Sequence, residues 1–248
     1  LAFFTGRDQS QSFTGWWAQA FGTPNYAAHG GFCSVNMAAG GIYTIGGAFW
    51  EFGQPDWDRT KLFVMFGVAE DHDSNPIKMG LGKLKGRGAR VIGVNPIRTG
   101  YNAIADDWYG ITPGTDGLLI LSLLHCLLQA GKVDLEYLAR WTNAPLLVNE
   151  AEGPEKGLIL KNAESQPFVI DKRTGAPAPW DGLGVQPDLG AVYQGHRTVF
   201  QHMAERYLSA DYAPEQVAER CGISANRIRI LAAELARVAF DEAIEIDQ

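Results

Sequence analysis

Blocks of apolar and polar residues predict a mixed α/β chain. The apolar run Leu62–Phe66 is closed by Gly67, which is typical of a parallel strand buried on both faces. A helix of about a dozen residues follows, with Pro76 near its first turn, and residues 89–94 form the next apolar strand. This β-loop-α-β order brings two strand ends to one edge of a sheet, where ligands of open α/β sheets bind.

The remaining pattern is mostly helical. A strand is predicted at residues 1–4, and Thr115 or Asp116 is expected to cap a nearly all-apolar, buried helix at residues 116–129. Other helices are predicted at residues 9–21, 33–39, 134–141, 193–208, 214–220 and 224–239. A proline- and glycine-rich stretch at residues 145–190 contains short hairpin strands at residues 158–160 and 168–170.

These elements predict an α/β fold: an open, mostly parallel, Rossmann-like sheet with flanking helices, followed by a helix-rich C-terminal part with a small β-hairpin insertion. The expected domains are an α/β region at residues 1–130 and a helical region at residues 131–248 that contains the insertion. The most apolar stretch, at residues 118–128, is too short to span a bilayer.

Composition and charge narrow the function. The 248 residues are 46% hydrophobic and 20% charged, which excludes a disordered or collagen-like chain. The formal net charge is −7, and an acidic chain without a basic stripe is a poor partner for nucleic acid. Cys33, Cys126 and Cys221 lie far apart, so this segment alone predicts no disulfide framework and no zinc or iron–sulfur site. Nucleotide signatures of the G-x-G-x-x-G and P-loop kinds are absent, as is a G-x-S-x-G elbow.

Two groups of residues suggest chemistry. His29 and Cys33 stand four apart at the entry to a glycine-flanked helix. They form either a buried thiol beside a loop histidine or a thiolate favoured by the helix dipole, suited to nucleophilic attack or to a soft metal.

The second group combines a strand end and a helix start, Asn95 to Thr99 and Pro113-Gly114-Thr115-Asp116. Taken separately, the two segments are ordinary turn and cap chemistry. Taken together, they expose backbone donors, and Asp116 is able to accept two hydrogen bonds from a purine.

The order of these segments resembles one family. The residues that carry the resemblance are Gly22-Thr23-Pro24-Asn25, His29, Cys33, Gly67, Ser74-Asn75-Pro76, Arg87 to Ile92, Asn95-Pro96, Ala105-Asp106 and Pro113-Gly114-Thr115-Asp116. They are similar to motifs of the molybdopterin oxidoreductases of the dimethyl sulfoxide reductase superfamily. The match is strong over residues 1–128 and looser beyond.

The resemblance implies molybdenum, less often tungsten, held by two molybdopterin guanine dinucleotides. It places the guanosine end of one dinucleotide at the second strand end and at the Pro-Gly-Thr-Asp turn. The residues carried over are Asn95, Thr99, Pro113, Gly114 and Asp116, with Gly67, Ser74 and Asn75 near the phosphates. The sequence departs from the family twice. Asn95 stands where Asp is frequent, and residues 70–73 place acidic groups where a diphosphate is expected.

The same resemblance makes Cys33 the protein ligand of the metal. Ser34 is adjacent, and serine is the metal ligand in other branches of the family. His29 either orients substrate or a proton or is a structural loop histidine. Formate dehydrogenases carry histidine directly after the ligand, and Ser34 stands there instead. The pattern, together with Thr142 to Pro145, is more similar to polysulfide, thiosulfate and tetrathionate reductases and sulfite dehydrogenases.

The expected function is therefore a two-electron, molybdenum-dependent reaction of a sulfur oxyanion, either sulfite oxidation or reduction of polysulfide, thiosulfate or tetrathionate. The alternatives are a formate, nitrate or arsenic-oxyanion oxidoreductase, or a non-catalytic subunit that kept the fold. We expect a central part of a catalytic subunit, with a [4Fe-4S] cluster in a preceding segment. The expected partners are a membrane anchor and an iron–sulfur electron-transfer subunit. The expected location is cytoplasmic, peripheral to the inner membrane, with the periplasm as the alternative.

Overall fold

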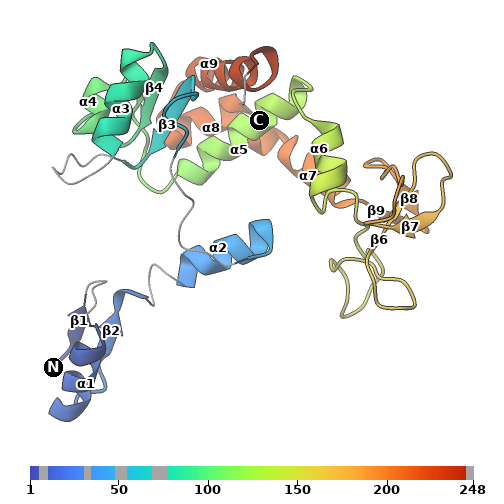
Figure 1. Cartoon of the computed structure of the whole chain (residues 1–248), viewed down its shortest axis with the longest axis horizontal. Coiled ribbons are helices and arrows are strands. Elements are labelled where there is room, and N and C mark those ends of the chain that lie inside the picture. Colours follow the sequence, from blue (N-terminus) through green and yellow to red (C-terminus); the bar gives the residue numbers. More distant parts are fainter. Residues whose placement is uncertain (6–10, 31–34, 48–54, 69–76, 244–248) are drawn as a thin grey trace. The chain divides into compact units, whose positions relative to one another are not determined.

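The computed structural model describes residues 1–5, 11–30, 35–47, 55–68 and 77–243 (Figure 1). The chain forms two compact units, Leu1–Asp56 and Trp57–Gln248, each with its own internal contacts. The division expected near residue 130 lies inside the second unit and stays a prediction.

In the first unit, two short strands pair in parallel. β1 (Phe3–Thr5) aligns with β2 (Tyr26–Ala28), and α1 (Gln11–Phe21) lies between them in the sequence. The ring centroids of Phe3 and Trp17 are 5.3 Å apart, so α1 packs an aromatic residue against β1. The strand and the first helix expected near the N-terminus are confirmed, whereas β2 is too short to show a pattern in the sequence.

The next helix, α2 (Val35–Ile45), is longer than the helix predicted at residues 33–39. The predicted end is wrong because the helix continues through Gly40 and Gly41. A glycine inside a helix costs about 1 kcal/mol but still makes its backbone hydrogen bonds. The helix ends at Gly46, whose φ is +77° and whose N–H donates to the carbonyl of Ile42 at 3.2 Å.

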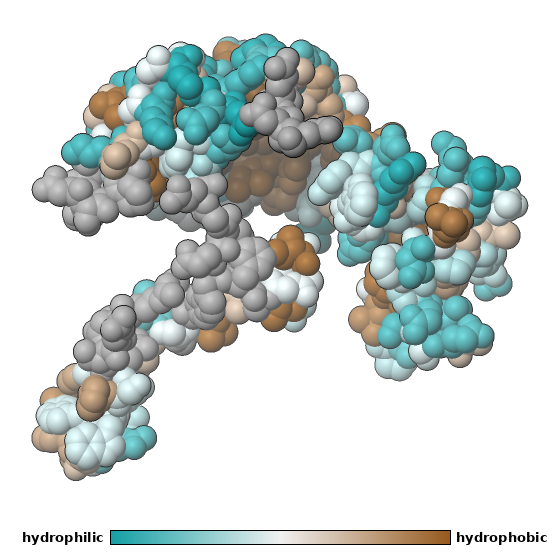
Figure 2. All heavy atoms as spheres, viewed as in Figure 1, coloured by the Kyte–Doolittle hydropathy of each residue, from teal (hydrophilic) through white to brown (hydrophobic). Residues whose placement is uncertain are grey.

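Both helices of this unit expose large apolar side chains, and Figure 2 shows brown, hydrophobic atoms along the surface of α2. Ala18 is the buried hydrophobic residue among the described part of the unit. The exposed residues are Phe13, Trp16, Trp17 and Phe21 on α1, and Val35, Ile42, Tyr43 and Ile45 on α2.

The second unit is built on a parallel sheet of order β3-β4-β5. β3 (Leu62–Phe66) and β4 (Arg90–Val94) confirm the two predicted strands, and Phe66 aligns with Val94 at their carboxyl ends. β5 (Asp107–Tyr109) escapes prediction because three residues, one of them charged, make no apolar run. The described residues thus contain a three-stranded sheet, and a wider open sheet stays a prediction.

One face of this sheet, with Phe63 and Val91, packs against α3 (Ile77–Gly86) and α4 (Tyr101–Ile104). Side chains on a strand alternate between faces, so the neighbouring residues point to the other side. The buried residues of this layer are Met65, Leu81, Leu84, Val91, Tyr101 and Ala105.

The opposite face, with Val64 and Ile92, packs against α5 (Asp116–Gln129), α8 (Pro214–Cys221) and α9 (Ala225–Ala236). These helices confirm three predicted ones, and α5 has the predicted bounds. The prediction that α5 is buried on all sides is wrong, because the helix packs through one side: Leu119 and Leu123 are buried, whereas Ile120 and Leu124 are exposed. Helices on both faces of a parallel sheet make this unit an α/β structure, as expected. No helix in the described ranges has the length and apolar character to cross a membrane.

Beyond α5 the chain forms α6 (Leu135–Trp141) and then the proline-rich insertion. β6 (Phe168–Ile170) confirms one predicted strand and pairs with β7 (Pro177–Pro179) in an antiparallel hairpin. The strand predicted at residues 158–160 is wrong, because that segment makes a single bridge, between Ile159 and Val148.

The helix predicted at residues 193–208 begins later, as α7 (Val199–Tyr207). The preceding residues form a second hairpin of β8 (Val192–Tyr193) and β9 (His196–Arg197). Its two-residue turn needs positive φ at both positions, and the φ values of Gln194 and Gly195 are +51° and +86°. Short helical turns at Ala210–Tyr212 and Arg237–Asp241 complete the described chain.

Candidate functional site

The carboxyl ends of β3 and β4 lie side by side and lead into turns. Gly67 follows β3, and its N–H donates to the carbonyl of Val94 at 3.0 Å, which places Gly67 beside Asn95. The φ of Gly67 is +69°, and a Cβ at this position would meet no atom of the described residues within 4 Å. The turn therefore needs glycine and leaves space in which a ligand can approach the main chain.

Asn95, directly after β4, is 7% exposed, and its main chain is fully engaged. Its N–H donates to the carbonyl of Tyr109 at 3.2 Å, and its carbonyl accepts from Nε1 of Trp108 at 2.9 Å. Its Oδ1 accepts from the N–H of Ile97 at 3.3 Å and so shapes the turn toward Thr99. No hydrogen bond to Nδ2 occurs within the described part of the chain, so this amide is able to donate to a ligand oxygen.

The segment between β5 and α5 supplies a second turn. Gly114 has a φ of +82°, and a Cβ there would lie more than 4 Å from the other atoms that the structure describes. Thr115 takes the N-cap position of α5, but its hydroxyl donates to the carbonyl of Thr112 at 2.7 Å. The expected side-chain cap by Thr115 or Asp116 is therefore wrong, and no side chain of the described residues caps the first N–H groups of α5.

Asp116, the first residue of α5, is half-buried. No hydrogen bond or ion pair joins its carboxylate to another described residue. A carboxylate at a helix N-terminus is favoured by the helix dipole, and its two oxygens accept two parallel hydrogen bonds. The ring N–H and the amino group of a guanine form such a donor pair.

The described residues predicted to bind cofactor all follow a strand end or lead from β5 into α5: Gly67, Asn95, Thr99, Pro113, Gly114 and Asp116. Thr99 is exposed at the end of the turn that starts at Asn95. Open glycine turns, an amide donor and an unpaired carboxylate are a set of groups that fits the guanosine end of a nucleotide cofactor.

The described residues do not test the metal end of the predicted site. Cys33, Ser34, Ser74, Asn75 and the acidic run at residues 70–73 lie outside them. His29 is half-buried directly after β2, in the first unit. In the ranges that the structure describes, no three or more His, Cys, Asp or Glu side chains are grouped so as to hold a metal ion.

Two residues near the strand ends are marked by no motif in the sequence. Trp108 holds the carbonyl of Asn95, and Asn102 on α4 is 0% exposed. Nδ2 of Asn102 donates to the carbonyl of Val68 at 3.1 Å. The one signal in the sequence is a polar amide among apolar neighbours, since Tyr101 precedes it and an alanine follows it.

Asp106, part of the Ala105-Asp106 motif, lies at the other end of β4. Its carboxylate accepts from Nζ of Lys85 at 2.7 Å and from the N–H of Val91 at 2.8 Å. The hydrogen bond from Lys85 is the main cause that lowers the pKa of Asp106 below its ordinary value of 3.8. These bonds join α3 to β4, so Asp106 has a structural role in the described unit.

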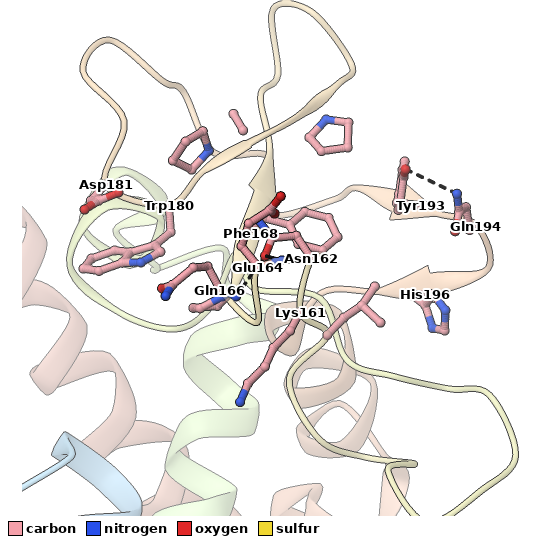
Figure 3. A pocket seen from close by; sticks show the side chains of 15 residues that line it. Lys161, Asn162, Glu164, Gln166, Phe168, Trp180, Asp181, Tyr193, Gln194 and His196 are labelled. Carbon is pink, nitrogen blue, oxygen red and sulfur yellow. Dashed lines mark hydrogen bonds between the residues drawn. The ribbon is translucent and has the colours of Figure 1, made fainter.

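A cavity of about 770 Å³ lies in the insertion (Figure 3). Phe168 of β6, Tyr193 of β8 and Trp180 contribute aromatic walls, and Nε2 of Gln194 donates to the Tyr193 hydroxyl at 3.2 Å. None of the predicted site residues lines this cavity. It is therefore separate from the strand-end site, by which we mean Gly67, Asn95, Thr99, Pro113, Gly114 and Asp116.

Comparison with known proteins decides the family. No family model matches the chain. A sulfite dehydrogenase subunit of Allochromatium vinosum is 47% identical, over 99% of this chain and 27% of that protein. A tetrathionate reductase subunit of Archaeoglobus fulgidus is 30% identical over 66% of this chain and 16% of that protein. The thiosulfate reductase molybdopterin-containing subunit of Salmonella typhimurium is 26% identical over 51% of this chain and 16% of that protein.

This chain belongs to the molybdopterin oxidoreductases of the dimethyl sulfoxide reductase superfamily. Acetylene hydratase from Pelobacter acetylenicus matches in structure with a TM-score of 0.55 and 17% identity, over 97% of this chain and 25% of that chain, which is a likeness of fold alone. This molybdopterin oxidoreductase chain spans about a quarter of the length of the sulfite dehydrogenase relative and less of the other two relatives.

Proposed function

We propose that the full-length protein is the catalytic subunit of a molybdenum-dependent oxidoreductase that oxidises sulfite. The observation that carries this proposal is the 47% identity to a sulfite dehydrogenase subunit over 99% of the chain. Relatives named for thiosulfate and tetrathionate reduction support the same class of sulfur substrate.

The cofactor in this proposal is a molybdenum bis(molybdopterin guanine dinucleotide). The guanosine end of one dinucleotide would be held by the carboxylate of Asp116 and the amide of Asn95, beside Thr99. The turns at Gly67 and at Pro113-Gly114 would let the main chain approach the nucleotide. The unpaired Asp116 carboxylate and the open space at Gly67 support this placement. We also expect the three strands to be part of a wider, Rossmann-like sheet in the complete protein.

At the other end of the cofactor, Cys33 would ligate the metal through its thiolate, which suits a soft metal. When bound, the cofactor supplies two-electron redox chemistry at molybdenum. The overall change is sulfite plus water to sulfate, two protons and two electrons. His29 would orient the substrate or accept one of these protons through a ring nitrogen.

The two electrons need an acceptor, and we propose a [4Fe-4S] cluster in another part of the full-length protein. From there the electrons would pass to a separate iron–sulfur subunit, which a membrane anchor would hold at the bilayer. The sulfite dehydrogenase relative is itself named as one subunit of an enzyme, which supports a complex of several chains.

We propose a cytoplasmic location at the inner membrane. Co-purification of the full-length protein and its distribution between membrane and soluble fractions test both statements.

The test of the substrate is a dye-coupled assay of full-length protein purified from molybdate-supplied cells. Sulfite should reduce the dye, and thiosulfate, tetrathionate, nitrate and formate serve as competing substrates. Turnover of formate or nitrate without sulfite would contradict the sulfur assignment. A purified protein that contains no molybdenum would instead support a non-catalytic subunit.

The test of the metal ligand is Cys33→Ala in the full-length protein. We expect loss of sulfite-dependent dye reduction with an unchanged far-ultraviolet circular dichroism spectrum, because the substitution removes the thiolate and changes one small side chain. Cys126→Ala is the matched control, since Cys126 is a free cysteine on α5, in the second unit. Retained turnover in Cys33→Ala would remove Cys33 from the site.

A further inference from the structure

Asn102 is a buried asparagine that reaches two turns at once. Its backbone N–H donates to the carbonyl of Thr99 at 3.0 Å, in the turn that follows β4. Its side-chain Nδ2 donates to the carbonyl of Val68 at 3.1 Å. Val68 follows Gly67, the first residue after β3. Asn102 is 0% exposed, so both of these donor groups are buried.

The space for this side chain exists because β4 carries glycine at position 93. A Cβ on Gly93 would lie 1.9 Å from Oδ1 of Asn102 and 2.9 Å from its Cγ. Any larger residue at position 93 would therefore displace the amide. Among the described residues Oδ1 has no hydrogen-bond partner, so contacts within this part of the chain do not give the amide a fully satisfied polar network.

We propose that Asn102 is a positioning residue for the nucleotide end of the cofactor. It fixes the distance between the turn at Gly67–Val68 and the turn at Asn95–Thr99, which would hold different parts of the same nucleotide. The inference rests on the proposed function, because it assigns Asn102 to the cofactor named there. Asn102 acts through the main chain of Val68 and Thr99 and does not itself touch the ligand.

The first test replaces Asn102 by alanine in the full-length protein. Loss of one neutral hydrogen bond should raise the hydrogen-exchange rate of the Gly67 amide about fivefold, because that amide is held next to Val68. Mass spectrometry of peptides that span residues 62–68 measures this rate. Ile104→Ala, on the exposed side of the same helix, is the control and should leave the rate unchanged.

The second readout is retention of the cofactor. We expect molybdenum and acid-released guanosine monophosphate to be lost from purified Asn102→Ala about fivefold faster than from the wild type during dialysis. Metal analysis and chromatography of the nucleotide measure the two losses without any activity assay. Ile104→Ala should again behave as the wild type does.

A double variant separates packing from hydrogen bonding. Gly93→Ala alone should lower the unfolding temperature strongly, because its Cβ meets Oδ1 of Asn102. In Gly93→Ala combined with Asn102→Ala the clash is gone and the new methyl group fills the space. We expect the unfolding temperature to recover, while fast exchange at Gly67 and fast loss of cofactor persist.

Three outcomes would overturn the proposal: unchanged exchange at Gly67 in Asn102→Ala, unchanged cofactor retention in the same variant, or full recovery of both in the double variant. The last would show that Asn102 serves packing alone. Failure of the proposed function gives a different result: the purified wild-type protein would contain no molybdenum and no guanine nucleotide, and Asn102 would have no cofactor to position. In that case the exchange rate of Gly67 still reports whether Asn102 holds Val68.

Discussion

At the scale of single residues, the strand-end site depends on groups whose usual partners are absent. The carboxylate of Asp116 has none among the described residues, and the hydroxyl of Thr115 turns back to Thr112. A free carboxylate beside uncapped helix N–H groups is an arrangement that accepts a polar ligand with both donor and acceptor groups. The Asn95 amide adds a donor at the neighbouring strand end.

Asp116→Asn should reduce the guanosine monophosphate content of the purified full-length protein on the order of tenfold, since an amide cannot accept both hydrogen bonds of a guanine and carries no charge. Chromatography after acid release measures the content. Asp134→Asn is the control: Asp134 caps α6 by accepting from the N–H of Tyr137 at 2.8 Å, and asparagine caps equally well. Equal nucleotide content in Asp116→Asn and the wild type would contradict the assignment.

A second residue-scale prediction concerns Glu150, whose carboxylate accepts from Nε and Nη2 of Arg197 at 3.0 and 3.1 Å. Hydrogen bonding to Arg197 lowers the pKa of Glu150 from 4.5 to about 2. A lowered folded-state pKa stabilises the fold above the unfolded-state pKa, and this contribution disappears as the pH falls through the folded-state value. The stability lost in Glu150→Gln should therefore be full above about pH 5 and shrink between about pH 4.5 and pH 2.

Chemical unfolding of the two full-length proteins across this pH range measures the difference. Glu155→Gln is the matched control, because Glu155 is exposed and no ion pair to it occurs in the described ranges. A difference between Glu150→Gln and the wild type that stays constant down to pH 2 would show that the ion pair does not stabilise the fold.

At the scale of elements, α3 shows that a tertiary contact decides whether a glycine inside a helix is required. The sequence does not distinguish the two glycines inside it, Gly80 and Gly82. A Cβ on Gly80 would meet the ring of Trp57 at 2.5 Å, whereas a Cβ on Gly82 would meet no atom of the described residues within 4 Å. The ring of Trp57 is itself held against Phe63, with centroids 5.3 Å apart.

The two glycine-to-alanine variants of α3 should therefore have opposite effects. Gly82→Ala should stabilise the protein by about 1 kcal/mol, because alanine is the better helix former at an exposed position. Gly80→Ala should destabilise it by about 1–3 kcal/mol, because the overpacked Trp57 ring must move. Thermal unfolding of the full-length proteins measures both changes, and a stabilised Gly80→Ala would show that the ring yields at no cost.

At the scale of the whole molecule, the two units differ in how much they bury. The Trp57–Gln248 unit has helices on both faces of its sheet and a core that includes Ile92, Leu119 and Leu231 at 0% exposure. The described part of the Leu1–Asp56 unit instead exposes most of its aromatic residues. Apolar surface of this kind provides no driving force for folding until it is covered.

Expressed separately, residues 57–248 should unfold cooperatively and residues 1–56 should not. The physical reason is that a short chain cannot offset its conformational entropy with little apolar burial, and Ala18 is the buried hydrophobic residue in the described part of this unit. Calorimetry, near-ultraviolet circular dichroism and binding of a hydrophobic dye measure the difference. A cooperative transition in residues 1–56 alone would contradict this interpretation of its surface.

Continuous apolar runs were readable in the sequence because their first and last residues mark where an element begins and ends. Leu62–Phe66 and Asp116–Gln129 have the bounds that these runs predict. The motif residues Asn95 and Asp116 were identified by type and spacing, and the comparisons confirm the family to which that pattern belongs.

Tertiary contacts decided the rest, because they join residues with no periodic relation. Asp107–Tyr109 forms β5 because it pairs with β4. Gly93 on β4 has no side chain, and the buried amide of Asn102 on α4 occupies the space that a side chain would fill. The hydroxyl of Thr115 bonds to a turn carbonyl rather than to the helix. Local pattern therefore determined the longer elements and the residue types of the site. The short strands, and whether each polar group is free or occupied, depended on neighbours that only folding supplies.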